Sequence, residues 1–180
     1  LATIRSRSQI VQIPVPPRTV AIEWLMQQDN KQLDWELLLK LGDGSPLEAI
    51  ENADESFLTR RKQISSAWCD LLNGTDDVVS LVESLAKIDP EEVILLGMTM
   101  FADVARHGLQ AGEEAIQNSD LRPQIAEIAE NLTSVQALAA VSRLQTDFRR
   151  LRGSQNPNKT LLLELLMLDC QNLDSQSYGL

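Results

Sequence analysis

The sequence predicts an all-α protein with one short strand near its N-terminus. Apolar residues recur at helical spacing over most of the 180 residues, and capping residues, early prolines and terminal glycines mark the ends of the periodic stretches. The most apolar stretch, Leu161–Leu168, reads Leu-Leu-Leu-Glu-Leu-Leu-Met-Leu. On a helix it would be apolar over more than half its circumference, so it must be surrounded by the chain's own bundle or by a neighbouring subunit.

Residues 1–17 differ from everything that follows. The run Ile10-Val11-Gln12-Ile13 is rich in β-branched residues and is ended by prolines, which predicts a strand. No partner strand is visible downstream, so we expect the last strand of a sheet formed by upstream residues, or an extended tail. Because the first residue is Leu1 and no secretion signal is visible, we expect a fragment of a longer protein.

A small three-helix unit is predicted next, with helices at residues 17–28, 34–41 and 46–52. Gly42 ends the second helix, and Ser45 can cap the third, which has Pro46 in its first turn. A unit of this size buries few apolar side chains, so we expect it to pack against a neighbouring part of the protein.

Longer helices follow from about residue 53. They are expected at residues 55–72, 76–88, 90–108, 120–131, 133–151 and from Asn158 or Thr160 to Leu173. The start at Pro90 is the strongest, because Asp89 can cap it and Glu91 and Glu92 complement its dipole. Without an internal repeat or a sustained heptad, these helices predict a bundle rather than a solenoid.

The charge balance favours protein partners. The formal net charge is −10, with 26 acidic and 16 basic residues, which opposes a large phosphate-binding surface. The basic clusters Arg60–Lys62 and Arg149–Arg152 are therefore interpreted as solvated faces or as contacts for acidic protein partners.

No metal, nucleophile or phosphate-loop pattern occurs in the sequence. His107 is the single histidine, Cys69 and Cys170 are far apart, and no Gly-x-x-x-x-Gly-Lys-Ser/Thr loop is found. The acidic pairs Glu91-Glu92 and Glu113-Glu114 are adjacent in sequence and point in different directions on a helix. Buried thiols predict a reducing, cytoplasmic location, and no stretch is apolar enough to predict a membrane span.

The order of short motifs is similar to that of clamp-loader subunits. Residues 1–8 read Leu-Ala-Thr-Ile-Arg-Ser-Arg-Ser, and they precede a strand, a proline-rich turn and a helix with Trp24-Leu25. This resembles the end of the family's AAA+ ATPase-type domain, whose signature is Ser-Arg-Cys. Gly44–Ala49 resembles the last helix of the family's lid, and Asn158–Leu166 resembles its C-terminal collar. Among clamp-loader subunits, the sequence most resembles the delta-prime type of bacterial DNA polymerase III.

The resemblance implies a domain organisation and a site. Residues 1–13 would end an ATPase-like domain, 14–52 would form a three-helix lid, and 53–180 a helical collar used for oligomerisation. Within the motif Ser6-Arg7-Ser8, Arg7 would reach the ATP bound by an adjacent motor subunit. Ser8 replaces the family's cysteine with a side chain of nearly the same size, so we expect Arg7 to keep its placement; if the Ser8 hydroxyl is buried, it requires a hydrogen bond.

Leu47 stands where motor subunits carry a nucleotide-sensing arginine. An apolar side chain cannot contact phosphate charge, so the resemblance implies a subunit that is not itself an ATPase and binds no cofactor in this portion. The expected partners are the motor (gamma/tau) and delta subunits, with the sliding clamp and primed DNA contacted indirectly. The alternatives are an ATP-hydrolysing motor subunit of the same complex, or an unrelated all-helical adaptor.

Overall fold

The computed structural model describes residues 7–9, 11, 14–28, 33–153 and 158–174, and every regular element in these ranges is helical. The chain divides into two compact units, Leu1–Asn52 and Ala53–Leu180. Most of the expected strand at Ile10–Ile13 lies outside the described residues. Val11, the one described position within it, is exposed and belongs to no regular element. The predicted all-α class is confirmed.

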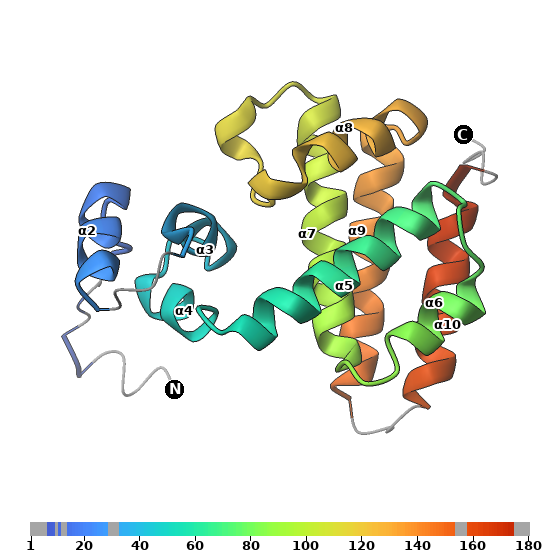
Figure 1. The fold of residues 1–180 in the computed structure, drawn as a ribbon, viewed down its shortest axis with the longest axis horizontal. Helices are drawn as coiled ribbons and strands as arrows, with labels where there is room; N and C mark the ends of the chain where they lie inside the picture. The colour runs from blue at the N-terminus through green and yellow to red at the C-terminus, as the bar shows by residue number, and fades with distance from the viewer. Residues whose placement is uncertain (1–6, 10, 12–13, 29–32, 154–157, 175–180) are drawn as a thin grey trace. The chain divides into compact units, whose positions relative to one another are not determined.

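The described part of the smaller unit contains three short helices. They are α2 (Arg18–Gln28), α3 (Trp35–Leu41) and α4 (Pro46–Glu51) (Figure 1). Asp34 caps α3 by accepting a hydrogen bond from the backbone N–H of Leu37 at 3.0 Å. A small apolar core joins the helices and consists of Ala21, Leu25, Trp35, Leu38, Leu39 and Ala49.

The larger unit is a bundle around two long helices. Its helices are α5 (Glu55–Leu72), α6 (Val78–Ser84), α7 (Pro90–Gly108), α8 (Arg122–Asn131), α9 (Ser134–Leu151) and α10 (Lys159–Gln171). Figure 1 shows α7 and α9 running side by side, with α5 crossing them and α10 beside α6. Short 3₁₀ turns are also present at Glu113–Ala115, Ser119–Leu121 and Asn172–Asp174.

The core of the larger unit centres on Trp68 of α5. Its indole N–H donates to the Val93 carbonyl at 3.0 Å, and its ring meets Phe101 edge-to-face with 5.6 Å between centroids. Gly97 of α7 lies directly against this ring, since a Cβ built there would be 2.6 Å from an indole carbon. A glycine within a helix is unfavourable by itself, so its place in α7 is explained by the close approach of the indole.

The predicted end of α6 was wrong. The helix ends at Ser84 and not at Ile88, although both Leu85 and Ile88 remain buried. The Ser84 carbonyl accepts from the side chain of Gln63 at 2.6 Å, and the Ile88 N–H donates to Leu85 instead. A side chain from α5 thus takes the acceptor that another helical turn would have used.

Within this chain only one face of α10 is enclosed, so the expectation that a neighbouring subunit surrounds the remainder stays a prediction. Asn158 caps it by accepting from the N–H groups of Thr160 and Leu161 at 3.1 and 3.2 Å. Its buried side chains are Leu163, Leu166, Met167 and Cys170. On the other face, the exposed fractions are 50% for Leu161, 54% for Leu165 and 42% for Leu168. In the part of the chain that the structure describes, no helix combines the length and apolarity needed to cross a membrane.

Candidate functional site

The arginine expected to act on a neighbouring subunit lies in the first described segment. Arg7 and Ser8 are exposed, in a turn and bend ahead of Pro14, whereas Ser6 lies outside the described residues. Because Ser8 is exposed, water can satisfy its hydroxyl and no buried hydrogen-bond partner is needed. The Arg7 guanidinium is therefore accessible on the small unit.

The position expected to have lost a nucleotide sensor is also accessible. Leu47 is the second residue of α4, two positions after the Ser45 cap, and it is 68% exposed. Ser45 accepts from the Glu48 N–H at 3.3 Å, so the start of the helix is held by the chain itself. Arg7 lies in a turn ahead of α2, whereas Leu47 lies on α4. An exposed leucine supplies no charge for a phosphate group.

Arginines of both basic clusters bind carboxylates of the chain itself. Arg60 Nε donates to Glu92 at 2.8 Å, and Arg152 Nε donates to Glu91 at 2.9 Å. The Arg152 guanidinium also lies over the Phe148 ring, 4.7 Å from its centroid. These pairs use much of the positive charge that a phosphate-binding surface would need.

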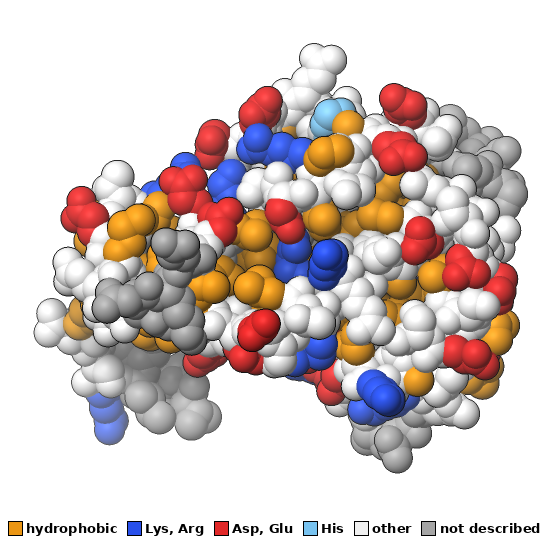
Figure 2. Space-filling view, viewed as in Figure 1, with side chains coloured by type: hydrophobic (Ala, Val, Ile, Leu, Met, Phe, Trp, Pro, Cys, Tyr) orange, Lys and Arg blue, Asp and Glu red, His pale blue; other side chains and the backbone are white. Residues whose placement is uncertain are grey.

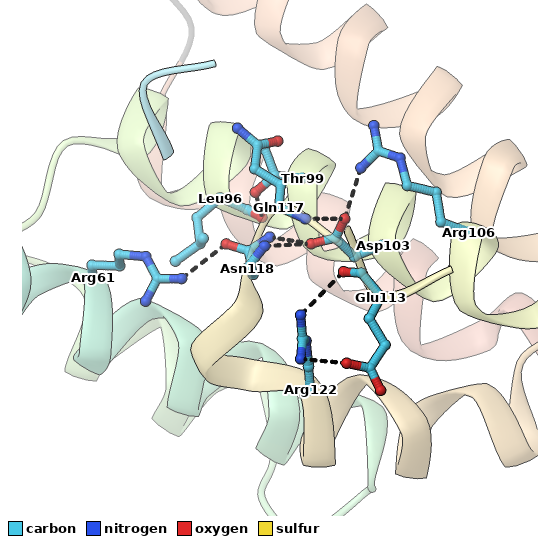
Figure 3. Close-up of polar contacts among 9 residues, drawn as sticks. All are labelled: Arg61, Leu96, Thr99, Asp103, Arg106, Glu113, Gln117, Asn118 and Arg122. Carbon is cyan, nitrogen blue, oxygen red and sulfur yellow. Dashed lines mark hydrogen bonds and ion pairs between the residues drawn. The ribbon is translucent and has the colours of Figure 1, made fainter. Parts of the chain in front are cut away.

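Arg61, from the first of these clusters, is a buried structural residue. Its guanidinium contacts both carboxylate oxygens of Asp120 at 2.6 and 3.0 Å and donates to Asn118 Oδ1 at 2.9 Å. Figure 3 shows this side chain reaching from α5 to the segment that joins α7 to α8. The Asp120 carboxylate, expected at a helix start, is therefore used by Arg61, and α8 begins two residues later.

Asp103 forms the centre of this buried network. It is fully enclosed within α7, and it accepts from the Asn118 backbone and side-chain N–H groups at 2.7 Å each. The Gln117 N–H donates to its other oxygen at 3.0 Å, and Arg106 reaches that oxygen at 2.7 Å (Figure 3). All four donors come from the chain, so the hydrogen-bonding capacity of the carboxylate is satisfied. The carboxylate thereby fixes the connector, the segment that joins α7 to α8, on α7.

The single histidine lines an open groove rather than a metal site. His107 lies where α7 ends, beside a hollow of about 810 Å³ bounded by the connector and by α8. Arg122 on its wall donates to Glu113 Oε2 at 2.9 Å and to the Glu113 carbonyl at 3.1 Å. Within the described ranges, no three His, Cys, Asp or Glu residues are grouped so that they could hold a metal ion.

The two cysteines are poor nucleophiles. Both are free thiols; burial raises the pKa of Cys69 to about 11 and that of Cys170 to about 12. Both thiols are thus protonated at neutral pH, and a protonated thiol neither attacks an electrophile nor binds a metal well.

The larger unit matches a known family. The protein-family model described as "DNA polymerase III, delta subunit, C terminal" matches residues 55–172, which include α5 to α10. The chain belongs to this family.

Relatives named "DNA polymerase III subunit delta'" match the chain over nearly its full length. Identity is 27% over 179 residues with the Pseudomonas aeruginosa protein, or 96% of this chain and 53% of that protein. For Haemophilus influenzae it is 25% over 177 residues, 94% of this chain and 50% of the relative. With the Yersinia pestis protein, identity is 27% over 169 residues, which cover 91% of this chain and 49% of that protein. The chain thus spans about half the length of these relatives, and the predicted resemblance to delta-prime subunits is confirmed.

Some of the features described above lie inside the region that matches the polymerase III family, and others lie outside it. The Asp103 network and α10 lie inside residues 55–172, whereas Arg7 and Leu47 lie outside them. Sequence reasoning found Arg7 and Leu47 through short motifs, but it did not find the Asp103 network. A carboxylate within the apolar pattern of residues 93–105 was the available signal, because such a group must find partners when buried.

Proposed function

We propose that the chain is the lid and collar portion of a delta-prime-type, non-motor subunit of a DNA polymerase III clamp loader. In this proposal residues 14–52 form the lid and 53–180 the collar that assembles with motor and delta subunits. The assembly loads the sliding clamp on primed DNA during replication. Membership of the polymerase III delta family and similarity to delta-prime subunits support this assignment.

Arg7 is the residue that we propose to act in catalysis by a neighbour. The observation that carries this role is an exposed arginine within the order Ser6-Arg7-Ser8, ahead of α2 in the small unit. A planar guanidinium can bind two phosphoryl oxygens at once and stabilise the charge that develops during phosphoryl transfer. Because the arginine is supplied from outside the ATP-binding subunit, hydrolysis depends on correct assembly.

Leu47 supports the non-motor assignment. An exposed apolar side chain at this position of α4 offers nothing to a nucleotide phosphate. The ATP that Arg7 would contact is then the substrate of the neighbouring motor subunit. We expect the full-length protein alone to bind ATP weakly or not at all, as equilibrium binding would measure.

The test uses the full-length protein reconstituted with motor and delta subunits. Arg7→Ala should lower clamp- and DNA-stimulated ATP hydrolysis at the neighbouring site by about tenfold or more without weakening assembly. Arg7→Lys should also lower it, because lysine keeps the charge but loses the planar fork. Arg18→Ala removes another exposed arginine of the same unit, one that pairs with Glu36 at 2.9 Å, and is the matched control.

The outcomes separate the two parts of the proposal. Loss of co-elution between the wild-type protein and the motor and delta subunits would overturn the clamp-loader assignment itself. Normal assembly with unchanged hydrolysis in Arg7→Ala would overturn only the role of Arg7.

A further inference from the structure

The exposed face of α10 carries a continuous apolar row. Leu161, Leu165 and Leu168, here called the α10 stripe, follow one another at spacings of four and three residues and therefore share one side of the helix. Each is between 42% and 54% exposed. In Figure 2, hydrophobic side chains reach the surface at the edge of the bundle where Figure 1 places α6 and α10. A row of exposed leucines on one helix face is typical of an interaction surface.

The size and spacing of the α10 stripe fit one helix. At 1.5 Å per residue, the seven-residue separation of its ends spans roughly 10 Å, about two helical turns. Anchors at i, i+4 and i+7 are those with which amphipathic helices pack against one another. An extended peptide would instead require a sheet edge, and no strand occurs among residues 14–28, 33–153 and 158–174.

The charges beside the stripe indicate the chemistry of the partner. Asp169 is engaged by Arg143, which also pairs with Asp147 at 3.3 Å. Glu164, next to Leu165, is half-buried and lies on the other flank. A basic side chain opposite Glu164 would therefore complete the contact, while a second acid would be repelled.

The same charges disfavour a second copy of this chain as the occupant. A two-fold axis through the middle of the short stripe would bring the two Glu164 carboxylates near each other. Arg143 of α9, on the opposite flank, is already paired with Asp169 and Asp147. Like charges at the centre of an interface cost affinity.

We infer that the α10 stripe docks an amphipathic helix from another subunit of the assembly, one that presents an apolar row and a basic side chain opposite Glu164. This inference rests on the proposed function, because it takes the partner from the polymerase III complex. Beyond the proposed function, it identifies the face of the larger unit that makes the contact and the kind of side chains that the partner helix presents.

The experiment measures association of the full-length protein with purified motor and delta subunits. Leu165→Glu should weaken association by at least about tenfold, since a charge would be placed at the centre of the apolar row. Leu165→Ser, a milder change, should weaken it less. Leu138→Glu is the matched control, because Leu138 lies on α9 and is 51% exposed, close to the 54% of Leu165. Circular dichroism melting of each variant verifies that it is folded.

A second pair of variants tests the charge. Glu164→Lys should weaken association severalfold, and the loss should shrink at high salt, where charge repulsion is screened. Glu130→Lys, an exposed acid on α8, makes the same charge change elsewhere and should leave association unchanged.

Each outcome decides one question. If the wild-type protein does not associate with these subunits, the proposed function fails and the inference loses its basis. If folded Leu165→Glu associates as the wild type does, or if Leu138→Glu is equally impaired, the inference is overturned while the proposed function stands. Self-association of the wild type that Leu165→Glu abolishes would assign the stripe to a second copy and overturn the inference.

Discussion

The two units of the chain differ in what their polar and charged residues do. In the smaller unit, Arg7 is exposed, and among its described residues six apolar side chains form the core. In the larger unit, the charged side chains of Arg61 and Asp103 are buried, and both hydrogen-bond to Asn118 in the segment that joins α7 to α8. The small unit therefore presents its functional candidate to solvent, while the large unit uses charge to fix its own fold.

This difference separates two kinds of substitution. A change at Arg7, the exposed functional candidate of the small unit, should affect function with little effect on folding. A change in the buried network or core of the large unit should affect folding first, and association only as a consequence. The following predictions test that separation, from the largest expected loss of stability to the smallest.

Trp68→Ala should destabilise the larger unit most. It removes a fully buried indole, its hydrogen bond to Val93 and its contact with Phe101. Large-to-small changes of this kind cost about 3 to 5 kcal/mol in free energy of unfolding. Urea denaturation followed by circular dichroism measures the loss, and a change below about 1 kcal/mol would contradict the packing described for α5 and α7.

Asp103→Ala should approach this loss through a different mechanism. It leaves the Asn118 side chain and two backbone N–H groups without their acceptor inside the protein. Each buried donor left without an acceptor costs about 1 to 3 kcal/mol. Asp103→Asn, which keeps one acceptor oxygen, should cost less. Hydrogen exchange should show lost protection at Gln117 and Asn118; if these amides stayed protected, the carboxylate would not be what holds the connector.

Gly97→Ala should destabilise the larger unit despite the better helix propensity of alanine. The added methyl group would lie 2.6 Å from the indole of Trp68, which has no flexible end to move away. Overpacking of this kind costs about 1 to 3 kcal/mol. The thermal midpoint measures the loss, and Gly74→Ala tests the effect of an added methyl at a site with open space, though there a positive φ of 65° adds backbone strain. A midpoint for Gly97→Ala at or above the wild-type value would contradict the proposed close approach.

Asp77 should give the smallest stability effect, and one that depends on pH. This N-cap of α6 accepts from the Ser80 hydroxyl at 2.7 Å and from the Ser80 N–H at 3.0 Å, and these bonds lower its pKa below 3.8. A carboxyl whose pKa is lower in the folded state than in the unfolded state stabilises the folded protein at pH values above the unfolded pKa. This stabilisation is lost as the pH falls through the folded pKa. Asp77→Ala should therefore lower stability at pH 7 and reduce the difference from the wild type below about pH 3.8. Thermal unfolding across pH measures this, and a difference independent of pH would contradict it.

The helices could be predicted because their end signals are local. Thr133 and Gln136 form a capping box at the start of α9, and Asp89 caps α7 with Pro90 in the first turn. These residues lie within one turn of the helix that they start, so sequence order alone identifies them.

The features that sequence reasoning missed depend on distant residues. Arg61 meets its partners 57 and 59 positions away, and Gln63 ends α6 from 21 positions away. Periodicity also could not show that the apolar circumference of α10 is buried on one side only, since that depends on how many neighbours the bundle supplies. Gly97 was a usable signal, because a glycine inside a helical pattern is unfavourable by itself and so indicates a close packing contact.

The central claim is that the exposed Arg7 of the small unit acts on ATP held by a neighbouring subunit. Its most direct test is the clamp- and DNA-stimulated ATP hydrolysis rate of the assembled complex with Arg7→Ala, measured beside the thermal midpoint of the same protein. We predict a hydrolysis rate at least about tenfold lower at that site, with an unchanged midpoint and normal assembly. An unchanged hydrolysis rate in a correctly assembled complex would contradict the account.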